Sequence, residues 1–361
     1  MKICYLADIN SAHTHKWLNY FVEKGYDIHV ISLGKGEYEG VTVHCLDVED
    51  GVMKKASDKT KLEYLKKIKS VKELVKEIKP DILHAHYASS YGLLGALTNY
   101  HPYMISVWGS DVYDFPIKSP IHKFIIKYNL KKADYILSTS NVMKKETEKY
   151  TNKSIEVTPF GVDINKFTPK KVEKDEIVIG TIKTLEEKYG VQYLVKAFKE
   201  VKDRNKDLKL KLRIGGKGSQ EQYLKSLSKE LGIKDDVAFL GFVTPENVIK
   251  EFQSFDMAVF PSTLDSESFG VAAVEAEACG TPIIVSNVGG LMESTKPGVT
   301  SLVVNKGSVD ELADKIDELV NNKELREEMG RAARKFVVDN YSLEDNFSYV
   351  DSIYKKVNLE K

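Results

Sequence analysis

The stretch from 260 to 290 constrains the fold most, because its proline and glycine residues divide it into short elements of alternating type. An apolar run before it predicts a strand that ends at Pro261, which cannot continue a central ladder. The alanine-rich run 271–278 predicts a helix, and Gly280 marks its end. The run 283–285 predicts a second buried strand. Strand, helix and strand in this order are typical of a parallel sheet covered by helices.

Two carboxylates, Glu267 and Glu275, carry the chemistry of this stretch. On one continuous helix they would lie about 12 Å apart along the axis and roughly 80° around it. The proline and glycine positions instead predict that Glu267 lies in the loop and Glu275 on the helix. Between them the N–H groups of 268–271 open the helix N-terminus, which attracts phosphate. This predicts a phosphate-binding site between two carboxylates that can accept hydrogen bonds from hydroxyl groups, an arrangement that suits a nucleotide diphosphate sugar. The alternative is a capped core helix with two incidental acids, and spacing alone does not decide.

Length and composition bound the remaining possibilities. A chain of 361 residues suits two domains of about 150–180 residues. Its formal charge of +0 speaks against a nucleic-acid or membrane binder as a whole, although the balance can hide local asymmetry. The scattered cysteines, Cys4, Cys45 and Cys279, argue against a disulfide framework and a zinc site. No apolar run approaches the roughly 20 residues of a membrane span, and the first strand begins at residue 2 without a signal peptide. A cytoplasmic setting is expected.

The first half of the chain opens with a strand over 2–7, a loop over 8–15, a helix over 16–24 and a strand over 27–33. This unit predicts a doubly wound parallel sheet, in which ligands bind at the carboxyl ends of the strands. The polar side chains that the first loop would turn towards such a cleft are Asp8, Asn10, His13 and His15. The alternative for each histidine is capping or simple exposure.

Two later strands end in residues of the same kind. The strand 80–86 ends with His84 and His86, which alternation places on one side, with at least one of them expected in the core. The strand 103–108 ends at Trp108, and Asp111 follows in the loop. All of these termini belong at the same edge of a parallel sheet.

A lysine-rich helix is predicted over 56–79, with apolar residues at helical spacing on one side. Between 54 and 79 there are 10 lysines against 4 acidic residues. The simpler interpretation is the solvated face of a covering helix. The sharper one is peripheral contact with an anionic bilayer, tested by charge reversal of Lys66, Lys67 and Lys69.

In the second half, two lysines five positions apart, Lys183 and Lys188, follow a predicted strand over 177–182. Together they could neutralise one diphosphate, or they could be solvated residues of a loop that also holds two glutamates. The turn 215–218 reads Gly-Gly-Lys-Gly, which allows close approach of the main chain to a ligand but is weak evidence alone.

The run E-S-F-G-V-A-A-V-E over 267–275 resembles the glutamate-x7-glutamate signature of retaining glycosyltransferases of family 4. The run K-T-L-E-E-K-Y-G over 183–190 is similar to the family's arginine-x4-lysine segment, with lysine in the arginine's place. The resemblance implies an α/β protein of the GT-B fold, with two Rossmann-like doubly wound domains facing a central cleft. It implies an acceptor domain over 1–167, a donor domain over 168–340 and a last helix over 341–361 that packs back on the acceptor domain.

The same resemblance implies roles for individual residues. Glu275 would bind ribose and Glu267 the sugar hydroxyls, while the lysines and the helix start stabilise the leaving diphosphate. The catalytic candidates are Lys183, Lys188, Glu267 and Asp111. The donor-binding candidates are Gly216, Val243, Ser268, Phe269, Gly270, Val271 and Glu275, with Glu293 as a secondary one. The acceptor-side candidates are His13, His86 and Trp108, which stands where several members have histidine, and no metal ligand is expected.

The function implied is transfer of a hexose from a nucleotide diphosphate sugar, with a UDP-sugar favoured over GDP-mannose, to a lipid-linked, polysaccharide or glycoconjugate hydroxyl. Retention of configuration, independence of metals and the absence of a cofactor are expected. The partners would be the donor, the acceptor and an anionic membrane surface at the inner face of the cell membrane, without nucleic acid. Two alternatives remain, a UDP-sugar hydrolase or epimerase of the same fold and a sugar-nucleotide-binding protein without catalysis. The sequence leaves the oligomeric state open.

Overall fold

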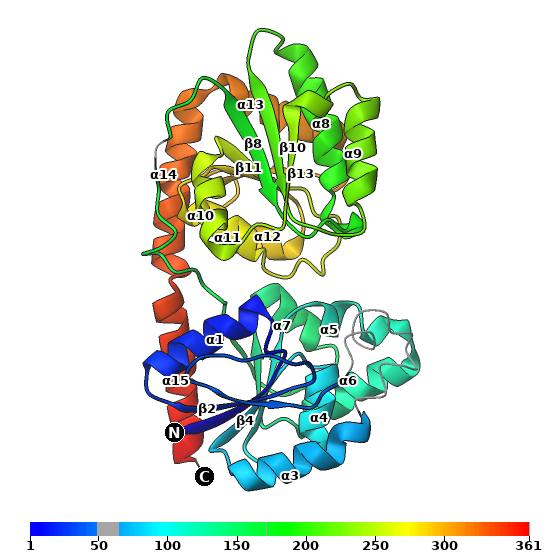
Figure 1. Ribbon diagram of the computed structural model, residues 1–361, viewed down its shortest axis with the longest axis vertical. Coiled ribbons are helices and arrows are strands. Elements are labelled where there is room, and N and C mark those ends of the chain that lie inside the picture. The colour runs from blue at the N-terminus through cyan, green and yellow to red at the C-terminus, as the bar shows by residue number, and fades with distance from the viewer. Residues whose placement is uncertain (49–64, 171, 361) are drawn as a thin grey trace. The chain divides into compact units, whose positions relative to one another are not determined.

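The computed structural model describes residues 1–48, 65–170 and 172–360, and the chain forms two compact units. The first unit comprises Met1–Phe160 with Glu344–Lys361, and the second comprises Gly161–Leu343. Each unit is built on one parallel sheet (Figure 1). The predicted pair of doubly wound, Rossmann-like units is therefore confirmed. None of the described helices is both long and apolar enough to span a bilayer.

The first unit holds a seven-stranded sheet in the order β3-β2-β1-β4-β5-β6-β7. Its strands are β1 (Lys2–Leu6), β2 (Asp27–Ser32), β3 (Thr42–Cys45), β4 (Ile82–His86), β5 (Tyr103–Val107), β6 (Tyr135–Ser138) and β7 (Ile155–Val157). Its helices are α1 (Ala12–Glu23), α3 (Ile68–Ile78), α4 (Ser90–Thr98), α5 (Ser110–Tyr113), η2 (Pro116–Lys118), α6 (Pro120–Lys132), α7 (Asn141–Thr147) and α15 (Leu343–Leu359). The central strand β4 is buried at every position, as expected of a strand covered on both faces.

Side-chain alternation along β1 sorts these helices onto the two faces of the sheet. Cys4 and Leu6 point into a core shared with α3, α4 and α6. Tyr5 points the other way and contacts Trp17 of α1, with ring centroids 6.2 Å apart. The helix α15 completes this second face, because Phe347 packs edge-on against Trp17 at 5.1 Å and Tyr354 donates to or accepts from His84 at 2.5 Å. The C-terminal helix is thus part of the core of the first unit.

The second unit holds a six-stranded sheet in the order β10-β9-β8-β11-β12-β13. Its strands are β8 (Ile177–Ile182), β9 (Leu210–Gly215), β10 (Val237–Gly241), β11 (Met257–Phe260), β12 (Ile283–Ser286) and β13 (Ser301–Val304). Its helices are η3 (Glu187–Tyr189), α8 (Val191–Arg204), α9 (Glu221–Glu230), η4 (Lys234–Asp236), α10 (Pro245–Ser254), α11 (Val271–Ala278), α12 (Gly289–Ser294), α13 (Val309–Asn321) and α14 (Lys323–Asn340). The elements predicted over 257–285 are present with bounds within a residue of those expected.

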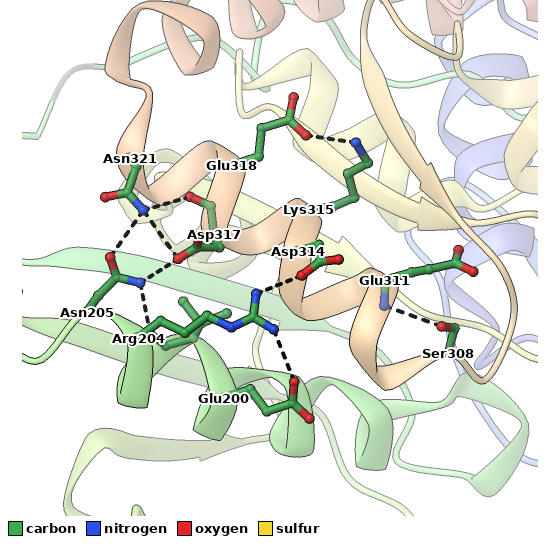
Figure 2. A network of polar contacts seen from close by, with 11 residues as sticks. Glu200, Arg204, Asn205, Ser308, Glu311, Asp314, Lys315, Asp317, Glu318 and Asn321 are labelled. Carbon is green, nitrogen blue, oxygen red and sulfur yellow. Dashed lines mark hydrogen bonds and ion pairs between the residues drawn. The ribbon is translucent and has the colours of Figure 1, made fainter.

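A polar network at the surface joins α8 and α13 (Figure 2). The guanidinium of Arg204 donates to Asp314 at 2.7 Å and lies 3.4 Å from Glu200 on its own helix. The amide of Asn205 donates to Asp317 at 2.5 Å. Exposed ion pairs of this kind contribute only about 0–1 kcal/mol each, so the apolar contacts beneath hold the two helices together.

Two expectations about local structure differ from what is observed. The first helix begins at Ala12 rather than Lys16, because Ser11 takes the extended cap conformation and its carbonyl already accepts from the N–H of His15. The segment 161–167 belongs to the second unit, since Val162 pairs with Ser342 and the guanidinium of Arg334 donates to the carbonyls of 164 and 167. Of the lysine-rich helix predicted over 56–79, the part over 56–64 lies outside the described residues, and the rest contains α3.

Replacing Phe347 with alanine removes the ring that joins α15 to Trp17 and leaves a cavity. We expect F347A to lower the free energy of unfolding of the first unit by about 3–5 kcal/mol. Both tryptophans, Trp17 and Trp108, lie in this unit, so urea unfolding followed by tryptophan fluorescence reports on it alone. The control is L359A on the same helix, where the side chain is 86% exposed and little change is expected. Equal midpoints for the two variants would contradict this account of α15.

Candidate functional site

Loops from the carboxyl ends of several strands meet at one edge of the second sheet. The loop after β8 lies against the glycine turn after β9, with Lys183 N–H bonded to Gly215 O at 2.9 Å and Leu185 N–H to Lys217 O at 3.0 Å. The loop after β11 joins them, since Thr263 N–H donates to Lys188 O at 2.8 Å. In open parallel sheets this edge is where ligands bind. The backbone therefore brings the predicted lysines close to the loop that carries Glu267.

Glycine makes this convergence possible, because three of the approaches leave no room for a side chain. A Cβ added at Gly190 would lie 1.9 Å from the carbonyl oxygen of Pro261, and one at Gly216 would lie 1.9 Å from that of Lys183. A Cβ at Gly290 would lie 2.2 Å from the carbonyl oxygen of Glu267. Gly190 and Gly216 also have positive φ angles, of 68° and 127°. The site is thus set by main chain packed on main chain.

The charged groups at this edge are paired directly. Lys183 Nζ lies 2.6 Å from Glu267 Oε2, and the two side chains are 18% and 7% exposed. Ser262 Oγ approaches the same carboxylate oxygen at 3.5 Å. The ring of Tyr189 is close to both lysines, with Lys183 Nζ at 4.5 Å and Lys188 Nζ at 5.2 Å from its centroid. Two cations and one carboxylate are therefore held around a tyrosine face that the sequence reasoning did not single out.

The helix α11 begins immediately after this cluster. Gly270 takes the left-handed cap conformation at φ 78°, and its carbonyl accepts from Ala273 and Val274. The helix therefore starts at Val271, directly after the loop that carries Glu267. The side chain of Phe269 does not face a ligand site, because it is 4% exposed and packs edge-on against Tyr341 at 5.2 Å. Its part in a donor site is limited to its main chain.

The remaining donor candidates lie around the same edge. Glu275 is half-buried on α11, one turn and a half from the cap at Gly270. Val243 is half-buried just after β10, and its side chain lies against Gly215, where an added Cβ would meet it at 2.8 Å. Gly216 N–H donates to Gly241 O at 2.7 Å, which ties that segment to the glycine turn. Glu293 is half-buried on α12, and its carbonyl accepts from Tyr341.

The three acceptor-side candidates of the first unit belong to one aromatic cluster. His13 stacks on Phe160, with centroids 4.5 Å apart and planes 9° from parallel, and it meets Trp108 edge-on at 5.8 Å. Trp108 also contacts Phe160 at 5.3 Å and His86 at 4.6 Å. Trp108 is half-buried, so the cluster keeps an accessible edge. Phe160 was not predicted as part of it.

His86 lies beneath this cluster and is 1% exposed. Neither ring nitrogen has a hydrogen-bond partner among the described residues. Burial, with His84 and His13 nearby, holds the pKa of His86 well below its usual range. His84 is buried as well, accepts or donates bonds with Tyr354 and Ser106, and burial lowers its pKa to about 3. Both histidines are core residues that stay neutral near pH 7, and His86 has no exposed surface for an acceptor.

The side chain of Asp111 holds the loop after β5. It was predicted as a catalytic polar contact, but its carboxylate is entirely buried and accepts the N–H groups of Ala88 at 2.7 Å, Gly109 at 2.8 Å and Trp108 at 3.2 Å. Burial raises its pKa, and these bonds oppose the rise. Asp111 therefore shapes the loop that presents Trp108.

The polar side chains of the loop after β1 are also hydrogen-bonded within the first unit. Asp8 accepts the N–H of Asn10 at 3.0 Å, the amide of Asn10 donates to Lys35 O at 2.9 Å, and His15 bonds to Ile9 O at 2.6 Å. Within the described residues, no group of three or more His, Cys, Asp or Glu side chains is arranged to hold a metal ion.

Comparison with known proteins identifies the class. A sucrose-phosphate synthase from Thermosynechococcus elongatus superposes with a TM-score of 0.86 at 18% identity, covering 100% of both chains. Anabaena HepE, solved with UDP-glucose, superposes with a TM-score of 0.79 at 17% identity, covering 99% of this chain and 100% of that one. At these identities the likeness shows the fold alone, which is the GT-B fold of glycosyltransferases.

Sequence comparison narrows the class to a family. The family model "Glycosyl transferases group 1" matches residues 163–336, and "Glycosyl transferase 4-like" matches residues 2–140. A glycosyltransferase of Methanocaldococcus jannaschii is 34% identical over 207 residues, covering 55% of this chain and 52% of that protein. The match thus spans about half the length of this curated relative. The chain belongs to the group 1 glycosyl transferases, with a glycosyl transferase 4-like first unit.

The steric role of Gly190 gives one prediction. G190A should displace the loop after β8 from Pro261, lowering the unfolding midpoint and abolishing nucleotide binding. The matched control is G232A in the same unit, where φ is 69° and nothing lies within 4 Å of the added Cβ. Both variants share the cost of a left-handed alanine, roughly 1–2 kcal/mol, so the difference between them isolates the clash. Equal midpoints in calorimetry and equal nucleotide binding would contradict it.

The buried, unpartnered His86 gives a second prediction. Because its folded pKa is depressed, the unfolded chain takes up a proton below about pH 6.5 and the folded chain does not, so stability falls as the pH drops. The H86L variant lacks the group that takes up this proton in the unfolded chain, and it also lacks the two buried nitrogens without hydrogen bonds. We therefore expect unchanged or higher stability at pH 7.5. Between pH 7.5 and 5.0 it should lose about 2 kcal/mol less than the wild type. Urea unfolding followed by tryptophan fluorescence measures both, and an equal loss in both proteins would contradict the buried neutral state.

Proposed function

We propose that this protein is a retaining glycosyltransferase that moves a hexose from a nucleoside diphosphate sugar to a hydroxyl of a lipid-linked, polysaccharide or glycoconjugate acceptor. The observation that carries the proposal is the pairing of Lys183 with Glu267 next to Lys188, at the strand edge from which α11 starts. A UDP-sugar is the favoured donor, which is supported by the HepE structure with UDP-glucose, and GDP-mannose is next.

The electrostatics of the pair support a role in releasing a diphosphate. Without a ligand, Lys183 and Glu267 neutralise each other in a largely buried place. A diphosphate brings its own negative charge, so it competes with Glu267 for Lys183. Lys188 and the N-terminus of α11 add to the attraction. Glu267 is then freed to accept hydroxyl groups of the sugar, and Glu275 is proposed to accept those of the ribose.

The proposed reaction balances without a protein nucleophile. The acceptor oxygen forms a bond to the anomeric carbon from the face on which the bond to the diphosphate oxygen breaks. The acceptor proton passes to the leaving phosphate. Lys183 and Lys188 stabilise the negative charge that grows on the leaving group, a role in which positioned cations are effective. We propose that these cations act in place of a metal ion and that no other cofactor takes part.

The first unit is proposed to bind the acceptor. The half-buried rings of His13 and Trp108, supported from within by the buried Phe160, are proposed to offer the apolar surface on which a sugar ring packs. Trp108 would take the place that histidine has in several relatives.

Calorimetric unfolding with UDP, GDP, ADP and CMP tests the donor assignment, because a ligand that binds only the folded state raises the midpoint. We expect a clear rise with UDP. K183M should lose most of it, because the diphosphate loses its buried cation, and E275A should weaken it through the ribose. With the matching UDP-sugar and an acceptor, K183M should lower kcat by about 10²–10³-fold.

The control is K250M on α10, an exposed lysine of the same unit, which should keep the wild-type shift and rate. Binding without any turnover in the presence of acceptors would favour a sugar-nucleotide-binding protein. Release of free sugar without an acceptor would favour a hydrolase. The absence of a shift with all four nucleotides would overturn the donor site.

A further inference from the structure

A ridge of exposed apolar side chains runs over η2 and α6 of the first unit. Ile117, Ile121 and Phe124 are 76%, 70% and 68% exposed, and Phe124 stacks on Tyr128 at 6.5 Å. On a helix of 3.6 residues per turn, positions 121, 124 and 128 fall within about 60° of one another. Single exposed apolar residues are ordinary, but a contiguous group at such exposure indicates an interaction surface.

A stripe of lysines lies beside this ridge on the exposed side of α6. Lys123, Lys127 and Lys131 follow one another at i, i+4 and i+8, within about 80°. The opposite side of the helix is buried through Ile126, Asn129 and Leu130, and the exposed arc is thus divided between apolar and basic side chains.

This stretch is basic throughout. Between Phe115 and Ala133 there are five lysines and no acidic residue, in a chain of net charge +0. Lys123, Lys127 and Lys131 form no ion pair through their ammonium groups with any residue that the structure describes. The uncompensated charge is therefore available to an anionic partner.

A basic groove of about 480 Å³ continues from the lysine stripe to the end of α7. Its lining residues are Lys127, Lys131, Glu148, Lys149, Tyr150, Thr151, Asn152 and Lys153. Within it Lys149 is paired with Glu146 and Lys153 donates to the carbonyls of 131 and 133. The cations left for a ligand are those of Lys127 and Lys131, at the side nearest the ridge.

We propose that this surface, the α6 face (Ile117, Ile121, Lys123, Phe124, Lys127 and Lys131), docks the protein on an anionic lipid bilayer. The apolar ridge enters the boundary between headgroups and acyl chains, and the lysines hold lipid phosphates at the surface and in the groove. A helix with large apolar side chains on one flank and lysines on the other has the composition of an interfacial membrane helix. The inference goes beyond the proposed function and does not depend on it.

Two observations favour a bilayer over other occupants. A second copy seated symmetrically on this face would bring lysines against lysines, which is repulsive. The described part of the lysine-rich segment around α3 lacks exposed apolar residues beside its lysines, because no large apolar side chain between 65 and 79 is among the exposed ones. There Lys69 is paired with Glu73 at 4.0 Å. The membrane contact predicted at Lys66, Lys67 and Lys69 stays a prediction, and among the described residues the α6 face supports a membrane contact better.

Vesicle sedimentation with the full chain tests the proposal. The wild type is mixed with phosphatidylcholine vesicles alone and with vesicles containing about one third phosphatidylglycerol, at low and at physiological salt. We expect binding to the anionic vesicles and little to the neutral ones. The double variant K127Q/K131Q should bind on the order of 20-fold more weakly, because each lysine near an anionic leaflet contributes roughly fivefold. F124S should weaken binding with little change in its salt dependence.

The matched control is K69Q/K72Q on α3, which removes the same charge from the same unit and should leave binding unchanged. Circular dichroism and the UDP-induced midpoint shift, measured in parallel, show that each variant is folded and that its donor site is intact. Failure of the wild type to bind anionic vesicles, or equal binding of all variants, would overturn the proposal. Loss of a dimer in light scattering with F124S would assign the face to a second copy instead. If inorganic phosphate competes with the anionic vesicles for the protein, the α6 face would instead be a binding site for free anions.

Discussion

The contact of main chain with main chain at glycine positions is the constraint on which the candidate site depends. At Gly190 and Gly216 the neighbouring carbonyl oxygen occupies the space that any side chain would need. This approach brings the loop after β8 down onto the loops after β9 and β11 and sets Lys183 2.6 Å from Glu267. The charges of the site are therefore positioned by backbone packing, and long flexible side chains need to span only a short distance.

The ion pair itself is a poor source of stability. Two largely buried charges lose hydration that their attraction only partly repays. In the proposed function a diphosphate changes this balance, because it adds negative charge next to a carboxylate that already holds the lysine. The ring of Tyr189 lies 4.5 Å from the ammonium of Lys183, close enough for a cation–π contact. A pair that is weak in the free protein is thus suited to exchange partners when a ligand arrives.

Sequence reasoning placed the elements of the second unit and the paired lysines well because glycine, proline and apolar runs act locally. It was less successful where the surroundings of a residue depend on contacts with residues far away in the sequence. No residue near Asp111 in the sequence indicates that its carboxylate accepts the N–H of Ala88. Likewise, no residue near His86 indicates that Tyr5 and Trp17 contact its ring. Tyr189 was missed for the same reason, since its closeness to both lysines depends on how the loop folds. The roles proposed for these residues go further than position and rest on the family resemblance.

The burial of His86 and Asp111 bears on the chemistry as well. These two are among the titratable groups that the sequence suggested at the ends of β4 and β5, and both are withdrawn from solvent, one neutral and one bonded to main chain. Neither is placed to take a proton from an acceptor. In the proposed reaction that proton goes to the departing phosphate, whose charge the lysines of the second unit stabilise. On this proposal the first unit supplies shape and stacking surface rather than a base, through the half-buried rings of His13 and Trp108.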